Sequence, residues 1–291
     1  MAIIPAFFLD AVVALGTEIT EGRKVWVGTG FLLGRKEKTD PDKSTVYIIT
    51  NKHVVKNQKS LYVRFNNLGQ TGVKDLLLDL EVNDERYYSE HPNANTDIVA
   101  IQINPNVIIR NNLRLSFFDE DKHALTLEQM MSTGVEEGSL VYALGFPMNL
   151  VNDKVKAPIC RLGCIARVAD AFLDAQKTEM FLVDAQTFPG NSGGPIISRP
   201  EHMSIEGTPQ NGSANLIGIL SAYIPYRDTL VSQQTKQAVM IREENSGLTI
   251  VHPVDRIREV VELEWERAEA KIAEKFKRIK EVANPKSEDA V

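Results

Sequence analysis

The chain is built mainly from short runs of β-branched and aromatic residues separated by turn residues. Five such runs precede residue 104 of the 291, and six follow residue 138. They cover residues 11–15, 25–33, 46–50, 61–65 and 98–103, then 140–144, 159–168, 180–183, 195–197, 216–220 and 248–251. Because no ten-residue helical pattern lies between them, they predict an all-β chain with a sandwich or barrel of antiparallel strands. A parallel doubly wound sheet is disfavoured.

A polar stretch without periodicity, residues 104–138, separates the two groups of runs. It predicts a connection between two β units, residues 1–103 and 139–252. Long polar loops are expected inside these units, and loops of this length in a compact domain usually have a function. They cover residues 34–44, 66–95, 198–215 and 226–247.

One long amphipathic helix is expected over residues 253–283, followed by a disordered tail over 284–291. Pro253 and the Asn284-Pro285 pair mark its limits. Its apolar residues recur every three or four positions, as one face of an α-helix requires: Ile257, Val261, Trp265, Ala268, Ile272, Phe276 and Ile279. The first turns are expected to pack on the β units. The later turns either protrude toward a partner or a second copy, or lie on the same domain.

The charge balance and the cysteines limit the function and the compartment. Lys and Arg number 33 against 39 Asp and Glu, a net charge of −6, which disfavours nucleic-acid binding and contact with anionic lipid. No run of eighteen apolar residues predicts a membrane span. Cys160 and Cys164 lie in one extended run, too far apart for a disulfide and without further zinc ligands nearby. Unpaired thiols favour a cytoplasmic location and no metal site.

The segment around Ser192 carries the strongest chemical signal. Residues 188–195 read Phe-Pro-Gly-Asn-Ser-Gly-Gly-Pro, and glycines beside a serine allow a sharp bend that exposes the hydroxyl and gathers backbone N–H groups. The pattern also fits the nucleophile elbow of α/β-hydrolases, with Asp228 and His252 as downstream partners. That elbow needs a helix after the serine. The Gly- and Pro-rich sequence that follows does not form one, so we disfavour this alternative.

Two upstream segments supply partners for Ser192 in a different order. His53 follows a strand-like run in Thr-Asn-Lys-His-Val-Val, and Asp97 opens the run Asp-Ile-Val-Ala-Ile. The chain order His, Asp, Ser is that of the chymotrypsin arrangement. Each residue alone has an ordinary structural explanation, but the three together favour a serine nucleophile. The remaining histidines, at positions 91, 123, 202 and 252, are expected at the surface.

Taken together, these segments resemble trypsin-like serine peptidases, most closely the HtrA-like bacterial branch. The resemblance extends over about residues 10–260 and includes Gly28-Thr29-Gly30-Phe31, Leu144-Gly145-Phe146-Pro147, Asp184-Ala185 and the segments 216–219 and 247–253. It implies a chymotrypsin-like fold of two six-stranded antiparallel β-barrels with the site in the cleft between them. His53 and Asp97 would come from the first barrel and Ser192 from the second.

The resemblance also implies a serine endopeptidase that acts on proteins or peptides through an acyl-enzyme, without metal or other cofactor. His53 would be the general base, Asp97 would orient it, and the N–H groups of Gly190 and Ser192 would form the oxyanion hole. The substrate pocket would be formed by Gln186, Thr187, Phe188, Leu220, Ser221 and Ala222. Gln186 stands where trypsin-like enzymes place the carboxylate that binds Lys or Arg. Small or medium apolar side chains are therefore expected before the cleaved bond.

Departures from the family pattern lead to expectations about regulation. Asn191 replaces the aspartate that pairs with a new N-terminus in many trypsin-like enzymes, so we expect no activation by cleavage. Ordering of loops 147–158 and 226–247, or an activating protein partner, is expected to gate activity instead. With no PDZ domain or membrane anchor apparent, a stand-alone peptidase is expected, recruited or self-associating through helix 254–283. The alternative is a catalytically silent peptide-binding or scaffold module that acts through this helix.

Overall fold

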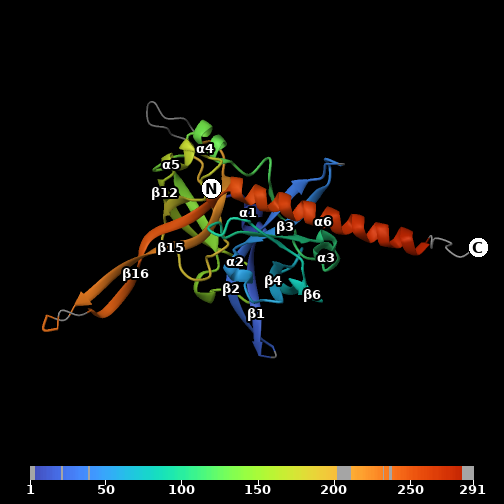
Figure 1. Cartoon of the computed structure of the whole chain (residues 1–291), viewed down its shortest axis with the longest axis horizontal. Coiled ribbons are helices and arrows are strands. Elements are labelled where there is room, and N and C mark those ends of the chain that lie inside the picture. The colour runs from blue at the N-terminus through green and yellow to red at the C-terminus, as the bar shows by residue number, and fades with distance from the viewer. Residues whose placement is uncertain are drawn as a thin grey trace, which may run out of the picture.

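The structure is a computed structural model that describes residues 4–20, 22–38, 40–201, 211–231, 233–235 and 238–283. Two β systems lie next to each other, and the long C-terminal helix runs across them before it leaves the body (Figure 1). The short helix α1 (Ala6–Ala11) leads into the first system. The residues expected to form a disordered tail, 284–291, lie outside the described part of the chain. The predicted all-β fold class with one long terminal helix is confirmed.

The first half is an antiparallel sheet wrapped around its own apolar core. The order is β5-β4-β1-β2-β3-β9, and the two-residue β8 (Ser89–Glu90) extends it beyond β9. The strands are β1 (Val12–Thr20), β2 (Arg23–Lys36), β3 (Ser44–Thr50), β4 (Ser60–Asn66), β5 (Val73–Asp79) and β9 (Val99–Ile103). A separate hairpin pairs β6 (Glu81–Val82) with β7 (Glu85–Arg86). Side chains such as Val13, Leu32 and Ile48 fill the interior.

The second half is a closed barrel of six strands in the order β11-β12-β13-β16-β15-β14. Its strands are β11 (Leu140–Gly145), β12 (Ile159–Arg167), β13 (Phe181–Asp184), β14 (Pro195–Ser198), β15 (Asn215–Val231) and β16 (Ala238–Pro253). The inward residues of these strands form one apolar cluster that includes Val141, Ile165 and Val183. A 3₁₀ turn (Pro147–Asn149) and helix α5 (Ala169–Leu173) lie in its connections.

Two segments expected as loops are strands. Within the expected loop 66–95, β5 pairs with β4 along its whole length. Within the expected loop 226–247, β15 and β16 continue past the barrel as a two-stranded ribbon, which projects from the body in Figure 1. Their exposed faces mix charged and apolar side chains, such as the Arg227–Glu243 ion pair of 2.6 Å and the exposed Ile241 on the ribbon and Leu77 on β5. Because neither face of the ribbon is buried, its sequence lacks the apolar alternation that marks a strand.

The connection 104–138 is packed rather than a bare bridge. It contains α3 (Pro105–Arg110), β10 (Phe118–Asp119) and α4 (Leu127–Thr133). β10 pairs in parallel with β2, so the connection adds a short strand to the first sheet. Ile108 belongs to the first core, and Leu127 and Met130 belong to the second. The segment therefore contributes apolar side chains to both halves.

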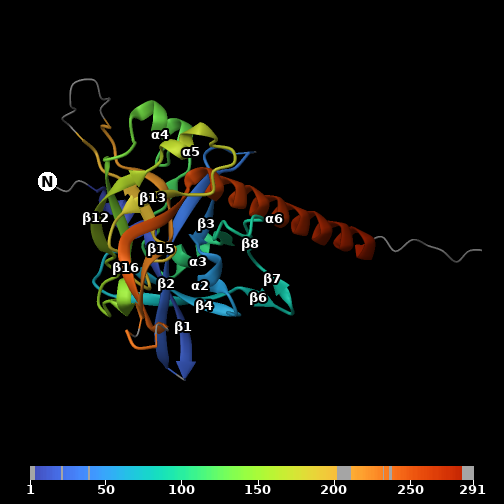
Figure 2. The ribbon, with the colours of Figure 1, turned by 60° about the vertical axis from the view of Figure 1, so that its left-hand side comes forward.

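Helix α6 (Val254–Ala283) confirms the predicted terminal helix. Ile257 and Val261 are fully buried, as the stripe of apolar residues predicts, and so is Val254 ahead of the stripe. Farther along, Ile272 is 55% and Phe276 60% exposed, and Figures 1 and 2 both show the later turns extending away from the body. Of the two arrangements left open by the sequence, the structure has the protruding one. No helix in the described ranges is long and apolar enough to cross a membrane.

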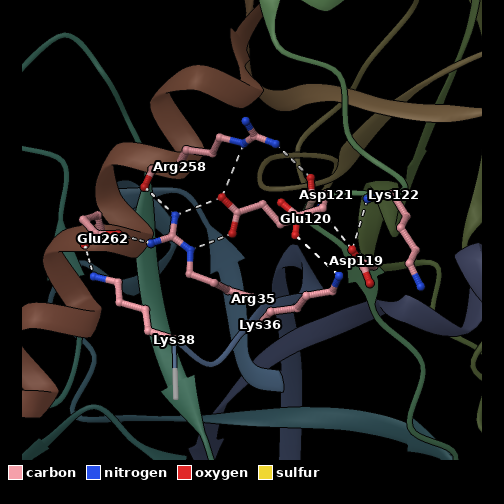
Figure 3. A network of polar contacts seen from close by, with 9 residues as sticks. All are labelled: Arg35, Lys36, Lys38, Asp119, Glu120, Asp121, Lys122, Arg258 and Glu262. Carbon is pink, nitrogen blue, oxygen red and sulfur yellow. Dashed lines mark hydrogen bonds and ion pairs between the residues drawn. The ribbon is translucent and has the colours of Figure 1, made fainter. Parts of the chain in front are cut away.

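A cluster of charges around the buried Glu120 fixes α6 to the first half. Figure 3 shows Glu120 between the guanidinium groups of Arg35 and Arg258. Arg35 on β2 bonds both Glu120 oxygens, at 2.7 and 2.9 Å, and also reaches Glu262 on α6 at 2.5 Å. Arg258 on α6 donates to the backbone oxygen of Glu120 at 3.0 Å. Because the buried Glu120 carboxylate pairs with two guanidinium groups, its burial is tolerated. The contacts of Arg35 and Arg258 join α6 to β2 and to the connection.

Candidate active site

His53 and Asp97 form a direct pair in the first half. His53 lies on the one-turn helix α2 (Lys52–Val55), and Asp97 precedes β9. The imidazole Nδ1 lies 2.5 Å from Asp97 Oδ2, and the His53 backbone N–H donates to Oδ1 at 3.2 Å. Asn51 Nδ2 donates to the Asp97 backbone oxygen at 2.6 Å and so joins the two segments. With its proton on Nδ1, the neutral imidazole has Nε2 free to accept a proton. The His53 side chain is half exposed.

Asp97 lies in an environment that keeps its carboxylate charged. Burial alone raises the pKa of Asp97, but hydrogen bonds from the His53 side chain and backbone and from Ser221 outweigh it. The pKa therefore lies below its ordinary value. Ser221 on β15 contributes through its hydroxyl, which donates to Asp97 Oδ2 at 3.2 Å. The carboxylate is ionised at neutral pH and able to stabilise a positive charge on His53.

Ser192 lies in the glycine-rich turn between β13 and β14, in the second half. Its hydroxyl donates to the backbone oxygen of Ser221 at 3.2 Å. Ser221 therefore touches both sides of the site, since its hydroxyl bonds Asp97 and its carbonyl accepts from Ser192. Of the three side chains expected to act together, His53 and Asp97 are in direct contact, and Ser192 is connected to Asp97 through Ser221. Strand β14 follows the turn directly, so Ser192 does not precede a helix and the α/β-hydrolase elbow is excluded.

Two backbone N–H groups of the turn, those of Gly190 and Ser192, have no backbone partner among the described residues. The carbonyl of Pro189 accepts from the N–H of Met148 at 2.7 Å. Because a trans peptide directs its C=O and N–H oppositely, the N–H of Gly190 points away from Met148. Gly190 has φ +97°, a conformation that strongly favours glycine.

Thr29 on β2 is a site residue whose role the sequence did not reveal. Its N–H donates to the Ser192 carbonyl at 2.9 Å, and its hydroxyl donates to the Gly190 carbonyl at 2.6 Å. The same hydroxyl accepts from the N–H of Phe146 at 3.0 Å. Thr29 therefore holds the serine turn from the first half. The only sequence signal for this role was the position of Thr29 between two glycines in a strand. Glycine often occurs in a strand where another backbone approaches closely.

The backbones of the two halves approach closely at Gly193. A Cβ atom there would lie 2.0 Å from the Thr29 carbonyl oxygen, and its φ is +84°. Gly193→Ala is therefore expected to destabilise the fold by more than about 4 kcal/mol, because rigid backbone would have to move. Denaturant unfolding would measure this. Gly138→Ala is the matched control, since Gly138 also has a positive φ but nothing within 4 Å. Equal losses in the two variants would contradict the clash and leave only backbone strain.

The loop after β11, which carries Met148, is anchored by the first half. The Trp26 N–H donates to the Asn149 side chain at 2.9 Å, and Arg64 donates to the Asn152 carbonyl at 3.0 Å. Asn66 exchanges two hydrogen bonds with the backbone of Lys156. The loop was predicted as a regulatory segment. The residues that anchor it, on β2 and β4, were not predicted.

Lys156 ends this loop with a deeply buried ammonium. Its Nζ donates to the backbone oxygens of Asp10 and Val12 at 2.5 and 2.7 Å. Burial lowers the pKa of Lys156 to about 8. Below pH 8 the group is charged in both folded and unfolded states, so the cost of burial is fully present. Above pH 8 the folded state releases the proton first, and stability rises until the unfolded chain also loses it.

The lowered pKa of Lys156 should make the free energy of unfolding depend measurably on pH. Between pH 8 and 10, the free energy of unfolding is expected to gain about 2 to 3 kcal/mol from Lys156. Urea unfolding as a function of pH would show the rise, and Lys156→Met is expected to remove it. Lys154→Met changes an exposed lysine of the same loop and is the control. Parallel profiles for wild type and Lys156→Met would contradict the assignment, whatever the absolute stability of the variant.

The six residues predicted to form the substrate pocket have different environments. Gln186 and Ala222 are exposed, whereas Thr187 and Leu220 are buried. The Thr187 hydroxyl lies 2.9 Å from the Thr249 hydroxyl, so it is used inside the barrel. Phe188 is half-buried beneath the Arg161 guanidinium, 4.9 Å from its ring centre. Ser221 bonds Asp97, as described above. The pocket assignment stays a prediction.

The expectation that the other histidines lie at the surface is wrong for two of them. His91 is 5% and His252 is 2% exposed, while His123 is half-buried. His202 lies outside the described residues. His252 Nε2 accepts the backbone N–H of Asp97 at 3.1 Å, so it contacts the site directly. Its place at a strand end suggested exposure, but β16 continues directly into a buried helix start and carries the ring inward.

The sequence profile of the trypsin-like peptidase domain matches residues 28–202, more than half of the chain. The chain belongs to the trypsin-like peptidase family. Two similar solved structures are of the Rv3671c protease in its inactive form, the second being a serine-to-alanine mutant from M. tuberculosis H37Rv. They are 14% and 13% identical, with a TM-score of 0.43 each. The matches cover 88% and 90% of this peptidase and 89% of each other chain. No curated protein sequence matches it significantly.

Proposed function

We propose that this trypsin-like peptidase is a serine endopeptidase with Ser192 as nucleophile, His53 as general base and Asp97 as the group that orients His53. The observation that carries the proposal is the chain of contacts from His53 through Asp97 and Ser221 to Ser192. A serine hydroxyl needs an adjacent base to attack an amide at neutral pH. A histidine with its Nδ1 proton held by a carboxylate is the base best suited to this task.

The proposed reaction uses these groups in two steps. The Ser192 hydroxyl turns from Ser221 to the imidazole, gives its proton to His53 Nε2, and Oγ bonds to the peptide carbonyl carbon. The proton then passes to the leaving amine, the C–N bond breaks, and an acyl-serine remains. Water attacks the acyl group in the same way, and the proton returns to Ser192 as the acid product leaves.

The negative oxygen formed in each step needs donors already in place. We assign this role to the N–H groups of Gly190 and Ser192, which donate to no acceptor within the described part of the chain. The support for Gly190 is indirect, through the hydrogen bond that holds the Pro189 carbonyl on Met148. The proposed gate is therefore the loop that carries Met148. If this loop leaves the first half, the Pro189–Gly190 peptide loses the contact that orients it.

Other parts of the proposal rest on the sequence. Asn191 carries no charge, and its side-chain oxygen accepts from the N–H of Phe188 at 3.2 Å within the turn itself. This supports an activation that does not depend on a new N-terminus. We further propose that the substrates have small or medium apolar residues before the cleaved bond. The proposal also includes an HtrA-like relationship and a cytoplasmic location. Finally, α6 would recruit the peptidase to a partner or mediate self-association.

A fluorophosphonate probe tests the proposed function. It reacts only with a serine that a base activates, so labelling of Ser192 is expected in the wild type and its absence in Ser192→Ala. His53→Ala should also abolish labelling. Ser132→Ala, which changes an exposed serine on α4, should not. A wild type that is never labelled, with or without candidate substrates, would contradict the proposal.

A second candidate function is supported by the protruding turns of α6. Ile272 and Phe276 lie one turn apart near the end of α6, and both are more than half exposed. Such a surface suits a scaffold module that binds a partner through its helix. The probe distinguishes the two, since a silent Ser192 together with partner binding that needs Phe276 would favour the scaffold.

A further inference from the structure

His252 is a buried histidine from the second half that contacts the backbone of Asp97 in the first. Its Nε2 accepts the Asp97 N–H at 3.1 Å, and its Nδ1 lies 2.7 Å from the carbonyl oxygen of Glu179. A backbone N–H can only donate and a carbonyl can only accept. The ring therefore carries its proton on Nδ1 and none on Nε2, which makes it a neutral imidazole.

The backbone of Asp97 is held on both sides. Its carbonyl oxygen accepts from Asn51, two residues before His53, while its N–H donates to His252. Its carboxylate lies between His53 and Ser221. Of these four partners, His252 and Ser221 belong to the barrel that carries Ser192. They are the contacts through which the second half determines where the carboxylate lies.

We propose that His252 is a positioning residue, which fixes Asp97, and with it His53, relative to Ser192. This inference rests on the proposed function, since Asp97 matters for turnover only if His53 acts as the base. Asn93 strengthens the connection, because its side chain donates to Glu179 Oε1 at 2.5 Å, beside the carbonyl that holds His252. Two contacts therefore join the halves beside the site, one from Asp97 to His252 and one from Asn93 to Glu179.

The charge state of His252 is part of its function. Burial lowers its pKa, and nearby His91 acts in the same direction. The Glu179 carbonyl and the charges of Asp97 and Glu179 oppose this shift. His91 is itself bonded to Glu259 of α6 at 2.7 Å, and Glu259 also pairs with Arg256. Protonation of Nε2 would place two donors against each other and displace Asp97.

The pH dependence follows from the direction of this shift. Above pH 6.5 the imidazole is neutral in both folded and unfolded states and adds no dependence on pH. Below pH 6.5 the unfolded chain binds a proton at His252 more readily than the folded chain does. The free energy of unfolding therefore decreases as the pH is lowered. Activity should fall over the same range, because protonation of His252 would displace Asp97.

Three variants test the proposal. His252→Phe keeps a ring but loses the acceptor, and leaves a buried N–H unpaired. It is expected to lower kcat about 10- to 100-fold with little change in KM. His252→Gln can place a side-chain oxygen near the position of Nε2, so most of kcat should be retained. Because glutamine does not titrate, activity should fall less steeply with decreasing pH in this variant than in the wild type. His123→Phe is the matched control, since His123 Nδ1 accepts the Asp119 N–H at 2.9 Å outside the site.

A second readout does not need turnover. The Nδ1 proton between His53 and Asp97, across a heavy-atom distance of 2.5 Å, should give a strongly downfield proton NMR signal. It is expected to shift or broaden in His252→Phe and to be kept in His252→Gln and His123→Phe. An unchanged signal and unchanged kcat in His252→Phe would overturn the proposal, as would equal losses in both phenylalanine variants. Failure of Ser192 to react with the probe would refute the proposed function, while the NMR signal would still decide the role of His252.

Discussion

Ser192→Ala is expected to lower kcat for peptide hydrolysis by about 10⁵- to 10⁶-fold, the largest effect of any single change in the chain. The variant removes the only atom proposed to bond the substrate carbon, and alanine at this position leaves His53 and Asp97 in place. KM should change little, because the hydroxyl contributes to bond formation more than to substrate binding. The hydrogen bond lost in the folded state, 3.2 Å to the Ser221 carbonyl, is a single one. Stability should therefore change by less than about 1.5 kcal/mol.

Hydrolysis of a peptide mixture followed by mass spectrometry would measure the loss in Ser192→Ala. Ser132→Ala is again the control. A variant that retains more than a hundredth of wild-type activity would show that another group performs the attack, and would contradict the proposed nucleophile.

Asp97→Asn is expected to lower kcat by about 10⁴-fold with little loss of stability. The amide has nearly the same shape as the carboxylate, but it can present an N–H to His53 Nδ1. The imidazole would then carry its proton on Nε2 and could no longer accept one from Ser192. The Ser221 hydroxyl, which donates to the same Oδ2 atom that faces His53, would instead accept from the second hydrogen of the amide, because a hydroxyl can donate or accept.

The measurement for Asp97→Asn is kcat with a peptide cleaved by the wild type, together with the labelling rate of the probe. Both should fall together, because both need an activated serine. Asp121→Asn changes an exposed carboxylate and should leave both rates unchanged. A loss in Asp97→Asn of less than tenfold would mean that Asp97 does not select the tautomer of His53.

The segments that carry His53, Asp97 and Ser192 could be predicted from sequence because each residue type is demanded by chemistry and flanked by a strand pattern. Thr29, Lys156 and His252 could not. Each acts on the backbone of a segment far away in the chain, as when Thr29 bonds Gly190 and Ser192. A contact of this kind leaves no periodicity and no spacing in the sequence, and becomes apparent only after the two halves are placed against each other.

The same distinction holds for the fold. Most strands with a buried face were predicted, although the short β10, which buries Phe118, was not. β5 and the β15–β16 ribbon were missed because charged and apolar residues mix on their exposed faces without a clear alternation. For α6, the apolar stripe predicted the helix but not where it leaves the body. That point depends on how far the surface beneath it extends, and the sequence of the helix does not contain this information.

Thr29, Ser221 and His252 all bond across the boundary between the two β systems, and the proposed machinery is divided along the same boundary. Neither half holds a complete set of reacting groups. A slight shear between them would abolish turnover while both cores, and the circular dichroism that reports them, stayed intact. Turnover therefore depends on the relative position of the two halves. Mild heat or dilute denaturant should abolish activity before any secondary structure is lost.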